Sequence, residues 1–316
     1  MSLPRPVVPG RTYMITRRCS ERRFFLRPDH ATNNNYLYCL AYAAQQAKVE
    51  VTFTCMMSNH HHTGINDRQG NFPVFLEKFH GLLARCQNAH LKRYEAFWSN
   101  EATSVVWLVR PEDVLDKLIY AFANPAAADL VDSINDWPGA HSYEATLTGG
   151  TITATRPKHF FRDEGQKGTL PETIMLKLER PIGFEGIAQP YWANMVKSKL
   201  REVEAGHRDR RRSEGKNVLG CRRVEKQSPF DRSKTWTPHF QLSPKIAAKS
   251  KWARIEAIGR DKAFVQQHTE AVRQTLAKIQ NVIFPFGTYL WRKLRHCLCE
   301  PDPASSLGLQ PEQVLA

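Results

Sequence analysis

Three consecutive histidines stand in the run Ser58-Asn59-His60-His61-His62, directly after an apolar, β-branched segment. Successive side chains of a β-strand point to opposite faces, so His60 and His62 share one face if the run opens a strand, and His61 points to the other. Imidazole nitrogens are common ligands of divalent metal ions. The run therefore predicts half of a metal site on one face of a sheet. The alternative is a polar turn with exposed histidines.

A tyrosine and an asparagine stand one helical turn apart in the segment YAFANP, residues 120–125. The i, i+4 spacing places Tyr120 and Asn124 on the same helix face, so a phenol hydroxyl and an amide oxygen can reach the same small volume. A positioned tyrosine can act as a nucleophile. Taken alone the signal is weak, because tyrosines near helix ends are more often amphipathic rim residues.

Together, the SNHHH and YxxxNP motifs resemble those of the HUH tyrosine transposases. Within that superfamily the chain is similar to the single-tyrosine, REP-associated branch and its insertion-sequence relatives. The resemblance covers about residues 10–145. It implies that His60 and His62 bind a metal ion, with Asn124 as a third, amide-type ligand. It also implies that Tyr120 is the catalytic nucleophile.

The enzyme implied by this resemblance cleaves and rejoins single-stranded DNA beside hairpins, with Mg²⁺ or Mn²⁺ as its cofactor. Attack by Tyr120 would leave a 5′-phosphotyrosine and release a 3′-hydroxyl. Ligating histidines must be neutral, so we expect activity to fall below about pH 6.5. The family includes homodimers, in which the tyrosine helix serves the partner's histidines, and also monomers.

Two features depart from the family pattern. The residue between the two histidines is usually bulky and apolar, whereas His61 occupies that position here. We therefore expect either a less deeply buried reverse face or a packed imidazole. The basic second half of the chain also extends beyond the compact family domain, and the resemblance implies nothing about its role.

The elements that must position these residues follow the order βαββαβ, with one further helix. Alternating and β-branched segments predict four strands, over Arg11–Cys19, Val49–Met57, His60–Asn66 and Ser104–Val109. Helical periodicity predicts three helices, over Asn33–Lys48, Pro73–Tyr94 and Pro111–Pro125, the last ended by its proline. This order predicts an α+β fold: a split βαβ, ferredoxin-like antiparallel sheet with two helices on one face and a tyrosine-bearing helix.

Positive charge is concentrated in the second half of the chain. Residues 1–150 contain 15 Lys and Arg and 14 Asp and Glu, whereas residues 151–316 contain 30 and 17. We predict a nuclease domain over 1–145, a linker or irregular segment over 146–190, and a basic, mainly helical extension over 191–316. A basic surface suits a polyanion such as DNA, and the residues predicted to contact it are Arg208, Arg210, Arg211, Arg212 and Lys216.

Aromatic residues of the basic half could stack on the bases of a single strand. The candidates are Phe230, Trp236, Phe240 and Trp252. Ordinary core packing is the alternative for all four.

The same residues are also compatible with other functions, and the sequence bears on the cellular compartment. A split βαβ sheet also serves non-catalytic nucleic-acid-binding proteins, which expose aromatic side chains on the central strands. A structural zinc site of the histidines with Cys55 is a further alternative. The seven cysteines show no paired CxxC spacing, and no apolar stretch approaches a membrane span. We therefore expect a cytoplasmic protein without membrane partners, associated with the nucleoid when it is bound to DNA.

Overall fold

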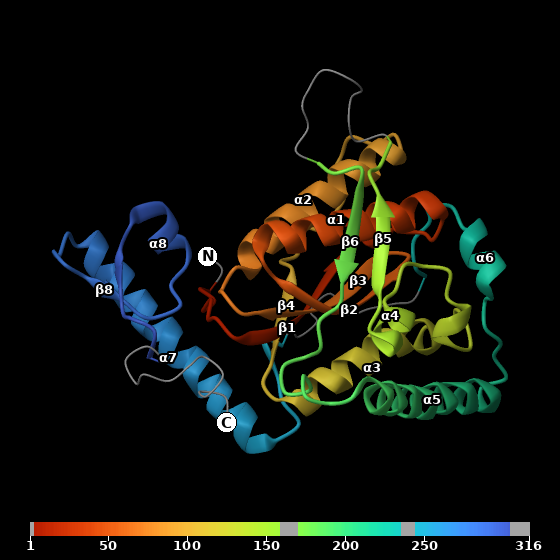
Figure 1. Ribbon diagram of the computed structural model, residues 1–316. Coiled ribbons are helices and arrows are strands. Elements are labelled where there is room, and N and C mark those ends of the chain that lie inside the picture. Colours follow the sequence, from red (N-terminus) through yellow and green to blue (C-terminus); the bar gives the residue numbers. More distant parts are fainter. Residues whose placement is uncertain (1–2, 159–169, 235–243, 304–316) are drawn as a thin grey trace.

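The computed structural model describes residues 3–158, 170–234 and 244–303 (Figure 1). At its centre lies a five-stranded sheet with the order β2-β3-β1-β4-β7. The first four strands pair antiparallel, and the short β7 pairs parallel with β4. The strands are β1 (Arg11–Arg18), β2 (Glu50–Met57), β3 (His60–Asp67), β4 (Ser104–Leu108) and β7 (Ile246–Ala247).

Helices cover both faces of this sheet. Two helices pack on the face that carries Tyr13, Ile15 and Ile65, and the third packs on the opposite face against Met14 and Phe53 (Figure 1). These helices are α1 (His30–Ala47), α2 (Phe72–His90) and α3 (Pro111–Ala127). The predicted α+β fold and its element order are confirmed, and the structure places the tyrosine-bearing helix on the second face of the sheet.

The prediction that Pro125 ends the tyrosine helix is wrong, because α3 continues to Ala127. A proline lacks only its own N–H donor, and its carbonyl still accepts a hydrogen bond. Leu130 N donates to the Pro125 carbonyl at 3.0 Å, and Ala128 N donates to that of Asn124 at 3.0 Å. Burial of Pro125 against the core holds this last turn in place. Asn124 therefore lies within the helix rather than at its end.

The segment predicted as a linker or irregular stretch contains a β-hairpin that packs on α1. Its anchors are long-range hydrogen bonds, including Tyr38 Oη to the Pro171 carbonyl at 2.6 Å and Asn34 Nδ2 to the Thr155 carbonyl at 2.8 Å. The segment's elements are α4 (Tyr143–Thr148), β5 (Thr151–Thr155) and β6 (Thr173–Lys177). The predicted domain boundaries stay predictions.

The basic second half is mainly helical in its described parts. Its first helix, α5, lies along α3, whereas α7 runs outward from the sheet beside β8 and α8 (Figure 1). No helix in the described ranges has the length and apolar character needed to cross a bilayer. The remaining elements are η1 (Ser20–Arg22), η2 (Ile134–Asp136), α5 (Gln189–Ser213), α6 (Cys221–Lys226), α7 (Lys251–Leu276), β8 (Ile283–Phe284), α8 (Leu290–Arg295) and β9 (Leu298–Cys299).

A buried arginine fastens α5 to the end of the tyrosine helix. The Arg211 guanidinium donates to the Ala126 carbonyl at 2.8 Å and pairs with Asp132 at 2.5 Å. Its side chain is 4% exposed, and the neighbouring Arg210 pairs with Asp129. These contacts satisfy carbonyls and carboxylates at the C-terminal end of α3, where positive charge is favourable. Arg211 therefore has a structural role in the free protein.

We predict that Arg211→Ala lowers the free energy of unfolding by about 2 kcal/mol, between the values for surface and buried ion pairs, because its carboxylate partners stay partly exposed. The matched variant Arg212→Ala removes a side chain that is 80% exposed, and its effect should stay within about 0.5 kcal/mol. Urea unfolding followed by circular dichroism measures both. Equal stability of the two variants would show that this attachment contributes nothing.

Candidate active site

The first residues of β3 bring two histidines together on the face of the sheet that α3 covers. His60 and His62 point the same way, and their Nε2 atoms are 3.1 Å apart. The register places His62 opposite Thr16 of β1 and opposite Cys55 of β2. Because β3 lies between two paired strands, its main chain is fixed along its length. The predicted alternation of side chains is therefore present.

The tyrosine and the asparagine of α3 face the same histidines. Asn124 Nδ2 lies 3.2 Å from His62 Nε2, and the Tyr120 ring centroid lies 5.3 Å from that of His62 at an interplanar angle of 74°. Tyr120 is 48% exposed, so a substrate can reach it. All four side chains belong to one chain. The structure thus brings together every residue predicted for catalysis and metal binding.

Close packing beneath the site depends on a glycine. Gly64 lies two residues beyond His62 on the same face of β3, and the Phe53 ring occupies the space that a side chain would need. A Cβ atom at Gly64 would lie 2.1 Å from Phe53 Cε1. Phe53 in turn contacts Phe122 of α3, with ring centroids 6.4 Å apart. This packing seats the tyrosine helix on the sheet.

Hydrogen bonds to the far side of each imidazole direct its Nε2 atom toward the site. The Asn59 amide oxygen can only accept, so His60 Nδ1–H donates to it at 2.7 Å and the lone pair of His60 lies on Nε2. His62 Nδ1 lies 2.8 Å from the Thr16 hydroxyl, which can accept its proton. Metal-binding histidines are commonly held in this way.

These residues fit a divalent metal ion. Two imidazole Nε2 atoms converge with the Asn124 amide, and a half-turn of that amide would present its oxygen to the same point. Among the described residues, no group of three or more His, Cys, Asp or Glu side chains is arranged to hold a metal ion. The alternative zinc site with Cys55 needs such a group, whereas a mixed imidazole and amide set does not.

Burial keeps both candidate ligands neutral. It lowers the pKa of His62 to about 3, with further contributions from the charges of Arg18 and Lys117. Burial, followed by the proximity of His62, also places the pKa of His60 well below its usual range. The expectation that the histidines protonate below about pH 6.5 rested on the pKa of an exposed imidazole. In the folded chain the neutral ligand form extends to lower pH.

The third histidine packs into the core on the opposite face. His61 is fully buried, and its Nε2 lies 3.0 Å from His80 Nε2 of α2. Its Nδ1 lies 3.0 Å from the Thr63 hydroxyl. Of the two arrangements expected for this departure from the family pattern, the structure has the packed imidazole.

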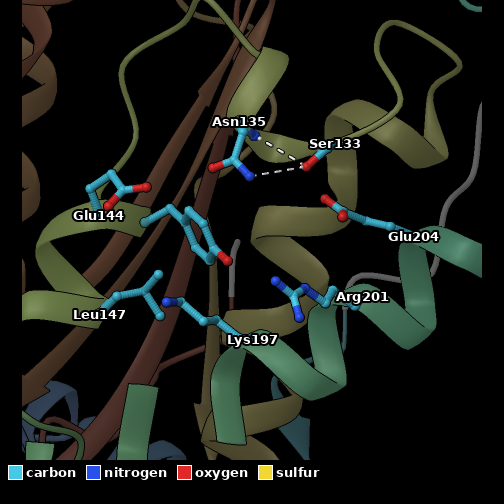
Figure 2. Close-up of a pocket in the computed structure, with 8 residues that line it drawn as sticks. Ser133, Asn135, Glu144, Leu147, Lys197, Arg201 and Glu204 are labelled. Atoms are coloured by element: carbon cyan, nitrogen blue, oxygen red, sulfur yellow. Dashed lines mark hydrogen bonds between the residues drawn. The ribbon is translucent and has the colours of Figure 1, made fainter. Parts of the chain in front are cut away.

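The tyrosines considered as alternative nucleophiles lie elsewhere. Tyr94 is 98% exposed, beyond the end of α2. Tyr143 packs on Phe122 and lines a separate cavity of about 250 Å³ between α4 and α5 (Figure 2). Burial and the nearby Glu204 raise the pKa of Tyr143, which disfavours its phenolate. The labelled residues around this cavity are Ser133, Asn135, Glu144, Leu147, Lys197, Arg201 and Glu204.

Four of the five residues predicted to contact DNA form ion pairs within the protein. Arg210 and Arg211 bind carboxylates near the end of α3, whereas Arg212 and Lys216 are exposed and pair with acidic neighbours. DNA contact by Arg208, Arg210, Arg211, Arg212 and Lys216 stays a prediction.

Two of the four stacking candidates, Trp236 and Phe240, lie outside the described residues. Trp252 is 77% and Phe230 49% exposed, so both are accessible. The surface needed by the non-catalytic alternative is covered, because Tyr13 of the central strand β1 is buried and β3 carries no Phe, Tyr or Trp.

Sequence reasoning missed two cations beside the site. Lys117 Nζ lies 5.3 Å from the Tyr120 ring centroid, and Arg18 is the register partner of His60. The i, i+3 spacing of Lys117 and Tyr120 is visible in the sequence and could have indicated the first. The pairing of β1 with β3 joins distant segments, so spacing alone carried no signal for the second.

Comparisons with known proteins add weak likenesses. No protein-family model matches the sequence, and no curated protein sequence matches it. A solved REP-associated tyrosine transposase bound to a REP hairpin is 13% identical with a TM-score of 0.40, over 52% of this chain and 99% of that chain. A proposed transposase from Deinococcus radiodurans R1 is 20% identical with a TM-score of 0.27, over 34% and 85% respectively. At such values the function has to be argued from the site itself.

We predict that Asn59→Ala weakens Mn²⁺ binding about 10- to 100-fold, because His60 loses the acceptor that orients it. Electron paramagnetic resonance of free Mn²⁺ during titration measures this affinity. Asn135→Ala is the matched control, since Asn135 is exposed and its side chain bonds only weakly to Ser133, at 3.5 Å. Wild-type affinity in the Asn59 variant would contradict the orienting role.

We also predict that Mn²⁺ affinity changes less than about twofold between about pH 7.5 and pH 5.5, because the lowered pKa of both ligands keeps them unprotonated. Two imidazoles with ordinary pKa would lose about 100-fold over this range. The same titration at both pH values, with circular dichroism to check folding, distinguishes the two results. A steep loss would mean that these histidines titrate normally.

Proposed function

We propose that this chain is a transposase-type endonuclease and strand transferase that acts on single-stranded DNA through Tyr120 with a divalent metal ion. The observation that carries the proposal is the convergence of Tyr120, Asn124 and the histidine pair, which lie some sixty residues apart in the sequence, around one point. Core packing alone does not require a half-exposed tyrosine beside two neutral, oriented imidazoles.

The reaction would be a transesterification. The Tyr120 oxygen forms a bond to phosphorus, the bond from phosphorus to the 3′ oxygen breaks, and the phenol proton leaves while the 3′ oxygen gains one. The 5′ end stays on the protein as a phosphotyrosine, so attack by another 3′-hydroxyl can reseal the strand without an external energy source. A divalent ion held by His60, His62 and Asn124 would supply Lewis-acid stabilisation of charge on the phosphate.

The chain's own residues would prepare the nucleophile. A phenol has a pKa of about 10, so its oxygen gains from nearby positive charge and from a fixed direction of approach. Lys117 supplies charge one helical turn before Tyr120, and the seating of α3 on the sheet supplies direction. Mg²⁺ and Mn²⁺ are the expected ions, with the mixed nitrogen and oxygen ligands favouring Mn²⁺.

A single strand is the expected substrate because the nucleophile lies on a helix packed against a sheet. The backbone phosphates of a duplex are less able to enter between α3 and the start of β3, whereas an unpaired strand can bend into the site. Hairpin-forming element ends, which present a single strand beside a duplex, are the proposed partners. The complete set of residues in one chain favours assembly of the site within a protomer.

We predict that Tyr120→Phe abolishes a covalent protein–oligonucleotide adduct while oligonucleotide affinity stays within about twofold, because only the attacking oxygen is lost. End-labelled single-stranded and duplex oligonucleotides are incubated with the protein and Mn²⁺ and resolved on a denaturing gel. Adduct formation is expected with wild-type protein, single-stranded DNA and metal ion together.

Tyr143→Phe is the matched control, because it removes the phenol oxygen that lines the separate cavity. An adduct that persists in Tyr120→Phe would move the nucleophile to another residue. No adduct with any hairpin-bearing strand, together with wild-type binding, would favour the non-catalytic nucleic-acid-binding function.

A further inference from the structure

Three cationic side chains from three different elements border the candidate site. Arg18 pairs with His60 in the register of β1 and β3, and directly opposed residues of antiparallel strands share a face. Lys117 of α3 lies beside the Tyr120 ring. Arg22 comes from η1, which follows β1; its guanidinium donates to Ser233 Oγ at 3.3 Å, and its charge acts on His60. We call this set of side chains, Arg18, Arg22 and Lys117, the cationic rim.

The main chain of Arg22 is held beside the site in an unusual conformation. Glu21 and Arg22 both have left-handed dihedral angles, with φ of 51° and 58°. Residues with a side chain adopt this region rarely, and it persists where surrounding contacts enforce it. Here Cys19 N donates to the Asn59 carbonyl at 2.8 Å, and Leu26 N donates to that of Ser58 at 2.9 Å. The turn is thus tied at both ends to the start of β3.

The Asn59 side chain joins this turn to the metal-ligand candidate. Its Nδ2 donates to the Arg22 carbonyl at 3.2 Å, while its Oδ1 accepts from His60 Nδ1 at 2.7 Å. One amide therefore fixes both the imidazole of His60 and the backbone of Arg22. Rotation of the Asn59 amide about its Cβ–Cγ bond moves both contact atoms at once.

The charges of the rim act on the site and on one another. Arg18 and Arg22 both contribute to the lowered pKa of His60, after burial and the proximity of His62. Burial lowers the pKa of Arg22, and the charge of Arg18 lowers it further. The imidazoles between these cations are neutral. Like charges gathered around neutral groups attract an anion, whose arrival also relieves their repulsion.

We propose that the cationic rim is a binding site for phosphodiester groups of a single nucleic-acid strand, and that Asn59 is the positioning residue that sets Arg22 within it. Guanidinium groups bind phosphate oxygens through paired hydrogen bonds, and an ammonium group acts as a point charge. Three cations around a half-exposed nucleophile suit consecutive backbone phosphates. The assignment of one of these phosphates as the scissile group rests on the proposed function.

Binding without chemistry tests the rim. The full chain carrying Tyr120→Phe is titrated in EDTA against a fluorescent single-stranded oligonucleotide at several salt concentrations, and anisotropy gives the affinity. Arg18→Gln, Arg22→Gln and Lys117→Gln should each weaken binding roughly tenfold, and each should reduce the slope of log K against log salt by about 0.7. Thermal unfolding confirms that each variant is folded.

The matched control is Arg273→Gln on α7, which removes the same charge from an exposed arginine paired with Glu270. It should change affinity less than about twofold. Equal losses in the control and the rim variants would show that net charge alone is responsible and would overturn the proposal. Unchanged affinity and slope in all three rim variants would overturn it as well.

The role of Asn59 is tested by a double-mutant cycle in the same metal-free assay. If Asn59 acts through Arg22, Asn59→Ala weakens oligonucleotide binding alone but adds little in the Arg22→Gln background. Fully additive losses would show that Asn59 does not position Arg22.

Failure of the rim and failure of the proposed function give different results. If wild-type protein forms no covalent adduct while the rim variants lose affinity, the rim stands as a strand-binding site and the catalytic function falls. If the adduct forms while rim variants bind normally, the catalytic function stands and the rim falls.

Discussion

The whole site depends on the register of β3. A strand that slipped by one residue would turn His60 and His62 into the core and bring His61 to the α3 face. The pairing of β3 with β1 on one side and β2 on the other prevents this slip. The His61–His80 contact also stabilises the register in which His61 faces α2. The position of Tyr120 follows, because α3 packs on the residues that this register presents.

Local patterns predicted the elements that carry the candidate site well. The order βαββαβ, the shared face of His60 and His62, and the one-turn spacing of Tyr120 and Asn124 all follow from periods of two and 3.6 residues. Contacts between residues that are distant in sequence were not predicted. The His61–His80 pair, the Arg18–His60 register and the attachment of Arg211 to α3 depend on tertiary contacts that no local period encodes. The predicted helix end at Pro125 was wrong for a related reason, since tertiary packing stabilises a last helical turn that the local sequence disfavours.

The basic second half is more than a charged extension of the first half of the chain. Part of its charge serves internal ion pairs at the end of α3, and Ile246 and Ala247 add a fifth strand to the central sheet. Composition could not separate these structural cations from those that face solvent, because both kinds occur in the run that ends α5. Net charge therefore overstates the surface that remains open to a polyanion.

The shared amide of Asn59 has a thermodynamic consequence. A ligand that displaces the Arg22 backbone removes one of the two contacts that hold the Asn59 amide, and so couples to the hydrogen bond that orients His60. Any such coupling is reciprocal, so an occupant of the imidazoles changes the affinity of the turn for its own ligand by the same factor. A ligand at the imidazoles and a ligand at the turn would then be coupled through the amide group of Asn59.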